Sequence, residues 1–296
     1  MSTRSGERVV RANGVDICVE TFGDAGDSPI LLIMGRAASM DWWEPAFCER
    51  LAAGHHFVVR YDQRDTGRSM HDAPGAPQYG SRDLVDDAAG LLDALGLARA
   101  HVVGMSSGGA IAQLFALNHP GKLASLTLMS TSALHPGLPK MSDELRAYFE
   151  HAAQAPLPDW SDRAAVIDFI VEGARPFAAH PFDEAGVRDI AAHAVDRDLD
   201  IASAMLNHDA MRDDGEGPWW PRLGEITVPT LVMHGDEDPL FHLEHGRALA
   251  RAIPVAELLV LEHVGHEVPR SAWDRIIDAI LRHTGRKRQS SVGGTL

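Results

Sequence analysis

The sequence has little cysteine, little positive charge and no long apolar run, and each shortage excludes a class of protein. Its two cysteines, Cys18 and Cys48, cannot form a disulfide framework and fall in apolar or helical surroundings typical of core residues. A formal net charge of -15 argues against binding to nucleic acid or to an anionic membrane. No apolar stretch approaches the roughly 20 residues of a membrane span, and residues 1–8 lack the apolar run of a signal peptide. We therefore expect a cytoplasmic protein that binds neither nucleic acid nor membranes.

What the sequence has instead is a regular alternation of strand and helix patterns. The Asn13-Gly14 pair predicts a hairpin between the first two strands, and continuous apolar runs indicate strands that are covered on both faces. This alternation predicts βαβ units and a mostly parallel central sheet flanked by helices, an α/β fold. Strands are predicted over residues 8–13, 15–21, 29–34, 56–62, 101–105, 123–129, 229–234 and 257–261, and helices over 43–53, 83–95, 243–253 and 272–283, with a further helix directly after Ser106.

The alternation stops between residues 133 and 222, where only helical patterns occur. A segment of this length is too long for a loop within a compact sheet, so we predict a helical cap inserted after the sixth strand. Residues 1–132 and 223–284 then form the core, and the polar, basic residues 285–296 are expected to be a disordered tail. Cap helices are predicted over residues 143–152, 161–174, 183–195 and 201–211.

The segment around Ser106 carries the clearest chemical signal in the chain. It has the pattern Gly-x-Ser-x-Gly, with an apolar strand before it and an alanine-rich helix after it. A nucleophilic serine on a sharp strand-to-helix turn needs neighbours without bulk two places on either side, and Gly104 and Gly108 meet this need. The five-residue pattern alone also fits a glycine-rich turn that merely contains a serine, but its strand and helix favour the nucleophile.

A serine nucleophile needs a base, and the base needs a carboxylate that orients it. On a parallel sheet these groups gather beyond the carboxyl ends of later strands, in the order serine, acid, histidine. Three acids follow the seventh predicted strand: Asp236, Glu237 and Asp238. We favour Asp238 because it directly precedes the turn-setting Pro239, whereas Asp236 is placed to bond its own loop. The three residues after the sixth strand contain no carboxylate, which strengthens this choice.

The candidate base follows the last predicted strand. His266 comes after Gly265 in a loop, and His263 in the same loop is the alternative.

Acyl transfer also needs donors for the developing oxyanion. We predict the backbone N–H groups of Ser107 and of Arg36, which follows Gly35 at the end of the third strand, although Gly35 also fits a simple strand-ending glycine.

Two further groups of residues lie near the expected cleft. The charged segment 60–69 predicts a network that fixes its own loop, because Asp62, Arg64, Asp65 and Arg68 offer mutual pairs at short range. The large aromatic side chains are typical of a core, and those in the insertion are also candidates to line an apolar substrate pocket. These aromatic residues are Trp42, Trp43, Phe149, Phe182, Trp219 and Trp220.

Taken together, these motifs resemble the α/β-hydrolase superfamily, and within it the esterases similar to aclacinomycin methylesterase, which act on methyl esters of aromatic polyketides. The resemblance covers most of residues 8–130 and 223–283. It implies the α/β-hydrolase fold, triad roles for Ser106, Asp238 and His266, and an oxyanion site around Arg36 with Met105 or Ser107. Many relatives have His-Gly where this chain has Met34-Gly35, and Met where it has Ser107, so the substrate stays open. The resemblance rests on residues 60–69, 101–106, 108, 111–113 and 234–239.

The sequence thus predicts a serine hydrolase that cleaves a small-molecule carboxylic ester through an acyl-enzyme. This chemistry calls for no metal ion and no organic cofactor, and the cap is expected to cover the cleft. Hydrolysis of a C–C bond, lactone or thioester, or perhydrolysis, would use the same triad. A binding protein without catalysis is the alternative of another class, and a homo-oligomer stays open. A dehalogenase or epoxide hydrolase is disfavoured because it needs a carboxylate where Ser106 stands.

Overall fold

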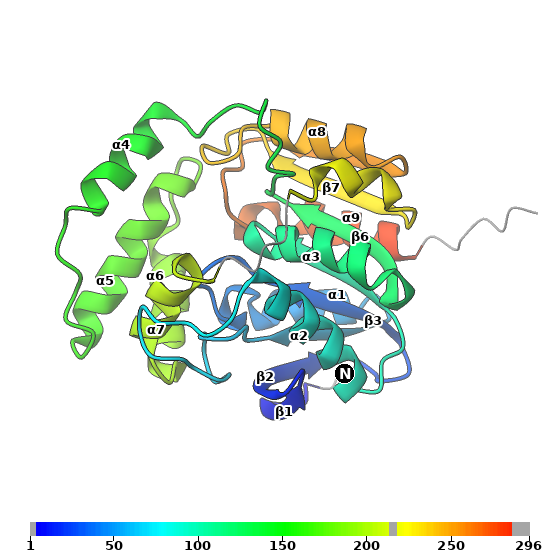
Figure 1. The fold of residues 1–296 in the computed structure, drawn as a ribbon, viewed down its shortest axis with the longest axis horizontal. Helices are drawn as coiled ribbons and strands as arrows, with labels where there is room; N and C mark the ends of the chain where they lie inside the picture. Colours follow the sequence, from blue (N-terminus) through cyan, green and yellow to red (C-terminus); the bar gives the residue numbers. More distant parts are fainter. Residues whose placement is uncertain (1–3, 213–217, 286–296) are drawn as a thin grey trace, which may run out of the picture.

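The fold is organised around one twisted sheet (Figure 1). The computed structural model describes residues 4–212 and 218–285, and the tail predicted over residues 285–296 lies, apart from Gly285, outside them. Within these residues eight strands pair in the order β1-β2-β4-β3-β5-β6-β7-β8; β2 is antiparallel to both neighbours and the other pairs are parallel. The strands are β1 (Arg8–Ala12), β2 (Val15–Phe22), β3 (Ser28–Ile33), β4 (His56–Tyr61), β5 (Ala100–Met105), β6 (Leu123–Met129), β7 (Thr230–Gly235) and β8 (Ala256–Leu261).

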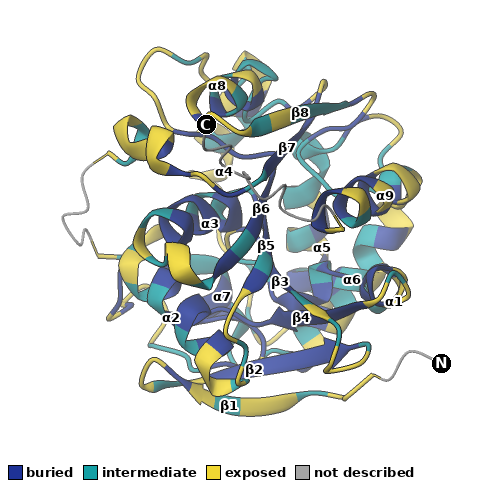
Figure 2. Cartoon of the chain, turned by 90° about the vertical axis from the view of Figure 1, so that its right-hand side faces the viewer, coloured by how far each residue is buried: buried dark blue, intermediate teal, exposed yellow. Residues whose placement is uncertain are grey.

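Helices cover both faces of the sheet, which explains the continuous apolar runs of its inner strands. Figure 2 shows α2 (Ser81–Ala94), α3 (Ser107–Asn118) and α8 (Glu244–Ala252) on one face, with α1 (Pro45–Ala52) and α9 (Trp273–Thr284) on the other. Each face has its own buried apolar cluster. The core therefore consists of two layers separated by the sheet, which is the predicted α/β architecture.

A helical segment, here called the cap, lies between β6 and β7. It contains α4 (Asp143–Ala152), α5 (Arg163–Ala174), α6 (Glu184–Arg197) and α7 (Ile201–Leu206), and among its described residues it adds no strand to the sheet. Figure 1 shows these helices together on one side of the core. Each begins after a side chain that accepts a hydrogen bond from the first turn, which satisfies N–H groups that lack a helical partner. These N-cap residues are Ser142, Asp162, Asp183 and Asp200.

The helix predicted over residues 201–211 is shorter in the structure. It ends at Leu206 and is followed by a 3-10 turn, Asn207–Asp209, whose first two residues are buried. The side chains of Asn207 and His208 contact the core instead of continuing the helix. No helix in the described part of the chain combines the length and the apolarity needed to cross a bilayer.

Candidate active site

Ser106 lies on a sharp turn between β5 and α3. Its φ of 55 and ψ of -120 are unusual for a residue with a side chain, and such strain persists only where the surroundings enforce it. The flanking glycines are sterically required. A Cβ at Gly104 would lie 2.3 Å from the Gly108 carbonyl oxygen, and one at Gly108 would lie 2.4 Å from the Ile33 oxygen. The turn therefore has the geometry predicted for a nucleophile elbow.

The structure brings Ser106, His266 and Asp238 into one hydrogen-bonded chain. Ser106 Oγ lies 2.8 Å from His266 Nε2, and His266 Nδ1 lies 2.8 Å from Asp238 Oδ2. Asp238 is buried, and its Oδ1 accepts the backbone N–H groups of Leu240 and Phe241 at 2.9 Å each. An ionised carboxylate can only accept, so Nδ1 carries the proton of a neutral His266. Nε2 then faces the serine hydroxyl as an acceptor, as a general base requires.

The three alternative residues lie together at the surface, away from Ser106. Asp236 Oδ1 accepts the backbone N–H of His263 at 2.7 Å, and Glu237 Oε1 lies 3.0 Å from His263 Nδ1. The side chain of His263 is 83% exposed. These residues pair with one another and leave Asp238 and His266 as the acid and histidine next to the nucleophile.

A buried histidine that the sequence reasoning missed lies behind the acid. The Nε2–H of His234 donates to the Phe241 carbonyl oxygen at 2.6 Å, and Nε2 is 3.6 Å from Asp238 Oδ2. Burial lowers the pKa of His234, so the ring is neutral near pH 7. Its bond holds the loop whose N–H groups bind Asp238. The His-Gly-x-x-Asp spacing in the sequence was the available signal.

The two residues predicted to supply the oxyanion donors, Ser107 and Arg36, lie in the segments next to the nucleophile. The N–H of Ser106 itself is occupied, because it donates to the Met129 carbonyl oxygen at 3.0 Å. Ser107 is the first residue of α3, where backbone N–H groups lack helical partners. Gly35 lies against the nucleophile: a Cβ there would be 3.3 Å from Ser106 Cβ and 3.8 Å from Oγ. Arg36 follows directly and lines the same cavity as Ser106.

This cavity has a volume of about 740 Å³ and lies between the core and the cap. Ser106 and His266 are in its wall. Ion pairs at the wall include Arg36 with Asp209 and Arg270 with Glu44, at 2.5 Å each. Most of the remaining wall is apolar: Met34, Ala38, Trp42 and Met105 from the core, and Met141, Phe149, Phe177, Phe182, Val187 and Ile190 from the cap.

The aromatic residues divide between the core and this cavity. Phe149 and Phe182, which belong to the insertion, line the cavity as predicted for the aromatic residues of that segment, and Trp42, which was expected in the core, lines it as well. Trp43 is fully buried in the core. Trp219 and Trp220 pack elsewhere: Trp219 Nε1 donates to Gln113 Oε1 at 3.0 Å, and Trp220 lies edge-on to His135.

The cap is attached directly to the loop that carries His266. The backbone N–H of His266 donates to the Phe177 carbonyl oxygen at 2.7 Å, and Glu267 Oε1 accepts the N–H of Ala179 at 2.9 Å. Gly265 permits this approach, because a Cβ there would lie 2.4 Å from the Phe177 oxygen. Burial raises the pKa of Glu267, and the Ala179 bond partly offsets the rise. The position of His266 therefore depends on a docked cap.

The segment 60–69 does fix its loop, but the predicted mutual side-chain pairs are wrong. Within the group of four, the structure shows a backbone bond from Arg68 N–H to Asp62 Oδ2 at 2.9 Å. The four side chains instead bond to residues of other elements. These partners lie too far away in the sequence for a local pattern to indicate them. Asp62 pairs with Arg197, Arg64 with Asp87, Arg68 with Glu7, and Asp65 accepts from Tyr79 and Asn207.

Arg197, on cap helix α6, is the centre of a buried ionic cluster. Its side chain is 3% exposed, and it binds Asp62, Asp41 (2.8 Å) and Glu7 (2.6 Å) on the core. Burial raises the pKa of Asp62, and the Arg197 guanidinium is the largest influence that lowers it. Asp62 also accepts the N–H of Met40 at 2.9 Å. The cluster ties the cap to the loops at the carboxyl ends of the strands.

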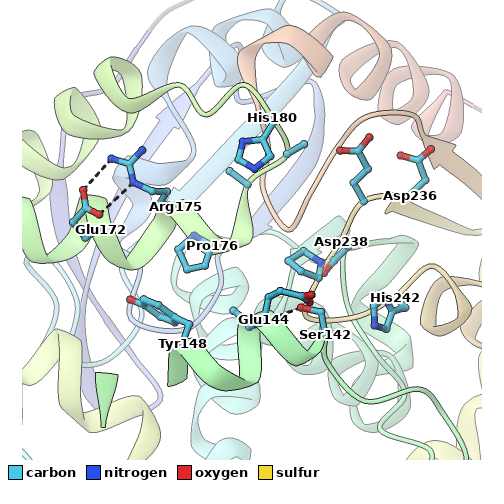
Figure 3. Close-up of a pocket in the computed structure, with 15 residues that line it drawn as sticks. Ser142, Glu144, Tyr148, Glu172, Arg175, Pro176, His180, Asp236, Asp238 and His242 are labelled. Atoms are coloured by element: carbon cyan, nitrogen blue, oxygen red, sulfur yellow. Dashed lines mark hydrogen bonds and ion pairs between the residues drawn. The ribbon is translucent and has the colours of Figure 1, made fainter. Parts of the chain in front are cut away.

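A second cavity of about 640 Å³ has Asp238 in its wall (Figure 3). Ser106 and His266 are not among its described lining residues. Figure 3 shows Tyr148 and Arg175 of the cap on one side and Asp236 and His242 of the core on the other. It is a groove between cap and core, lined by both charged and apolar side chains and bordered by the acid of the site.

The chain is similar to known proteins in both sequence and structure. The sequence matches the family described as alpha/beta hydrolase fold over residues 28–269. It is 33% identical to the rhodomycin D methylesterase DauP of Streptomyces sp. (strain C5), over 94% of this chain and 97% of the relative. It is 32% identical to the rhodomycin D methylesterase DnrP of Streptomyces peucetius, with the same coverage. Among solved structures, the esterase EaEST from Exiguobacterium antarcticum superimposes with a TM-score of 0.73 at 23% identity, covering 94% of this chain and 99% of the esterase.

Proposed function

Because this chain belongs to the alpha/beta hydrolase family, we propose that it is a carboxylic ester hydrolase with Ser106, His266 and Asp238 as its catalytic triad. The observation that carries the proposal is the hydrogen-bonded chain from Ser106 Oγ through both ring nitrogens of His266 to a buried Asp238. The relatives named methylesterases support the same reaction. A binding protein that has lost catalysis would have no need to keep this arrangement intact.

The reaction follows from the roles of these atoms. As Ser106 Oγ attacks the ester carbonyl carbon, His266 Nε2 takes its proton, and Asp238 stabilises the resulting imidazolium. The N–H groups of Ser107 and Arg36 bind the oxyanion that forms. Collapse of the intermediate breaks the C–O bond, and the leaving alkoxide takes the proton from His266. A water molecule, activated by the same base, then attacks the acyl-enzyme, releases the acid and restores Ser106.

We infer the substrate class from the cavity and from the relatives. An aromatic and methionine-rich wall around about 740 Å³ suits a large, flat, apolar acyl group. The methylesterase relatives suggest methanol as the leaving alcohol. We propose the methyl ester of an aromatic polyketide, or a similar apolar ester, as the substrate. A cytoplasmic location is part of the proposal and is supported by two free, buried cysteines.

Turnover of p-nitrophenyl esters and of a panel of aromatic methyl esters tests the proposal. Ser106→Ala should abolish turnover and labelling by a fluorophosphonate, because it removes the oxygen that forms the proposed acyl-enzyme. Ser161→Ala, at an exposed cap serine, is the matched control and should keep both. If the wild-type enzyme neither hydrolyses any ester of the panel nor is labelled at Ser106, the proposal is wrong.

A further inference from the structure

A histidine of the cap binds the loop that carries a proposed oxyanion donor. His208 lies in the 3-10 turn after α7 and is 6% exposed. The backbone N–H of Ala37 donates to His208 Nδ1 at 3.0 Å, and His208 Nε2 lies 2.9 Å from the Arg64 carbonyl oxygen. Ala37 directly follows Arg36, so the bond is made one peptide away from the proposed donor.

These two partners determine the protonation of the ring. A backbone N–H can only donate and a carbonyl oxygen can only accept. Nδ1 must therefore be unprotonated and Nε2 must carry the hydrogen, so His208 is neutral. Burial lowers the pKa of His208, which agrees with this state, and the Arg64 carbonyl bond partly offsets the shift. The charged groups around the ring are Asp65, Arg36 and Asp209, and the Tyr79 ring lies edge-on at 6.5 Å.

The loop over residues 34–37 needs such support. Ala37 has a φ of 58, a left-handed conformation that a residue with a Cβ rarely adopts. From the core, Gln63 Nε2 donates to the Met34 carbonyl oxygen at 2.8 Å. From the cap, His208 binds Ala37 and Asp209 pairs with the Arg36 side chain at 2.5 Å. Two consecutive cap residues thus hold two consecutive loop residues.

We propose that His208 is a positioning residue for the oxyanion site: by accepting the Ala37 N–H it fixes the backbone that presents the Arg36 N–H to the substrate. The inference rests on the proposed function. It means that the cap not only covers the cavity but also completes the catalytic geometry of the core. A loosened loop would weaken binding of the oxyanion in the transition state and leave binding of the uncharged ester largely unchanged.

Three substitutions separate this role from simple scaffolding. His208→Ala removes both ring contacts. In His208→Asn the side-chain oxygen takes the place of Nδ1 and can still accept from Ala37. In His208→Gln the amide nitrogen lies near the place of Nε2 and serves the Arg64 carbonyl instead. His71→Ala is the matched control: His71 also bridges cap and core, to Asp198 and the Ser69 carbonyl, without touching residues 34–37.

Two measurements test the role of His208. One is steady-state hydrolysis of p-nitrophenyl acetate, and the other is inhibition by a trifluoromethyl ketone, which forms an oxyanion on the serine. We expect His208→Ala to lower kcat about 10- to 100-fold, with KM changed less than about threefold. The inhibition constant of the ketone should rise in parallel with the loss of kcat/KM. His208→Asn should recover most of the loss and His208→Gln little, and His71→Ala should match the wild type in the ratio of ketone to substrate binding.

Two results would overturn the inference. One is a His208→Ala enzyme that keeps kcat and ketone affinity within about twofold of wild type. The other is recovery by His208→Gln that equals or exceeds recovery by His208→Asn, since the bond to the Ala37 N–H would then not be the contact that matters. If His208→Ala does not fold, the comparison of the Asn and Gln variants still decides. A wild-type enzyme without turnover or Ser106 labelling would instead contradict the proposed function.

Discussion

Replacing Arg197 with alanine should destabilise the protein far more than removal of any surface arginine. The guanidinium lies among three core carboxylates, and those of Asp41 and Asp62 are 1% and 0% exposed. Removing one partner of a buried ion pair leaves an uncompensated buried charge and costs about 3–5 kcal/mol. We expect a loss of this size for Arg197→Ala, because water cannot easily reach the two aspartates. Such a loss is a large part of a typical unfolding free energy of about 5–15 kcal/mol.

Arg163→Ala provides the matched control within the cap. Arg163 pairs with Asp196, the residue before Arg197, at 2.5 Å, but the two side chains are 55% and 53% exposed. An exposed pair contributes at most about 1 kcal/mol, so this variant should unfold at nearly the wild-type urea concentration. Urea denaturation followed by circular dichroism measures both. An Arg197→Ala protein as stable as the Arg163→Ala protein would refute the reasoning.

The pH dependence gives a second check with a defined sign. Without Arg197, the largest influence that lowers the pKa of Asp62 is gone, so its folded-state pKa rises further above the unfolded value of about 3.9. A group whose pKa is raised by folding favours the folded state below the unfolded pKa, and that contribution is lost as pH rises through the folded pKa. The deficit of Arg197→Ala relative to wild type should therefore be smaller at pH 5 than at pH 8. A deficit independent of pH would contradict the assigned role of Asp62.

Two further changes test the acid and the cap contact. Asp238→Asn should lower kcat for p-nitrophenyl acetate about 10⁴-fold, because an amide can present an N–H to His266 Nδ1 and so favour the wrong tautomer; activity within tenfold of wild type would exclude Asp238 as the acid. Gly265→Ala should lower both stability, by about 1–3 kcal/mol, and kcat, because its Cβ would collide with the Phe177 backbone. Gly224→Ala, where a Cβ has open space, is the control, and equal effects of the two in thermal unfolding and turnover would contradict the argument.

The parts of the fold that the sequence predicts are those whose residues are fixed by their immediate neighbours. The strand before Ser106 is apolar because both its faces are covered by helices. The sequence therefore predicts where this strand begins and ends to within about one residue. The elbow depends on Gly104 and Gly108, which are two residues away in the chain. Topology then places Asp238 and His266, because carboxyl ends of parallel strands meet at one edge.

The parts that the sequence does not predict depend on how the cap docks. Nothing near His208 distinguishes it from the other histidines of a chain that has 16, because its partners, Ala37 and Arg64, lie far away in sequence. Arg197 is the last residue of the amphipathic helix α6. Nothing in the helical pattern indicates its ion pair with Asp62, which is visible only in the packed structure. Local patterns carry no information on contacts that form between the cap and the core.

The cap is inserted between two paired strands, β6 and β7, and a segment inserted in this way is an obvious target for exchange when new substrates are wanted. The Arg197 cluster sets a condition on such chimeras. A transplanted cap without an arginine at this place would leave the core with buried carboxylates that repel each other. Grafts that carry over the α6 arginine, or that neutralise Asp41 and Asp62 in the recipient, should express as folded protein more often than grafts chosen by cavity shape alone. Exchange of the cap in this chain would thus change the substrate range and the ability to fold together.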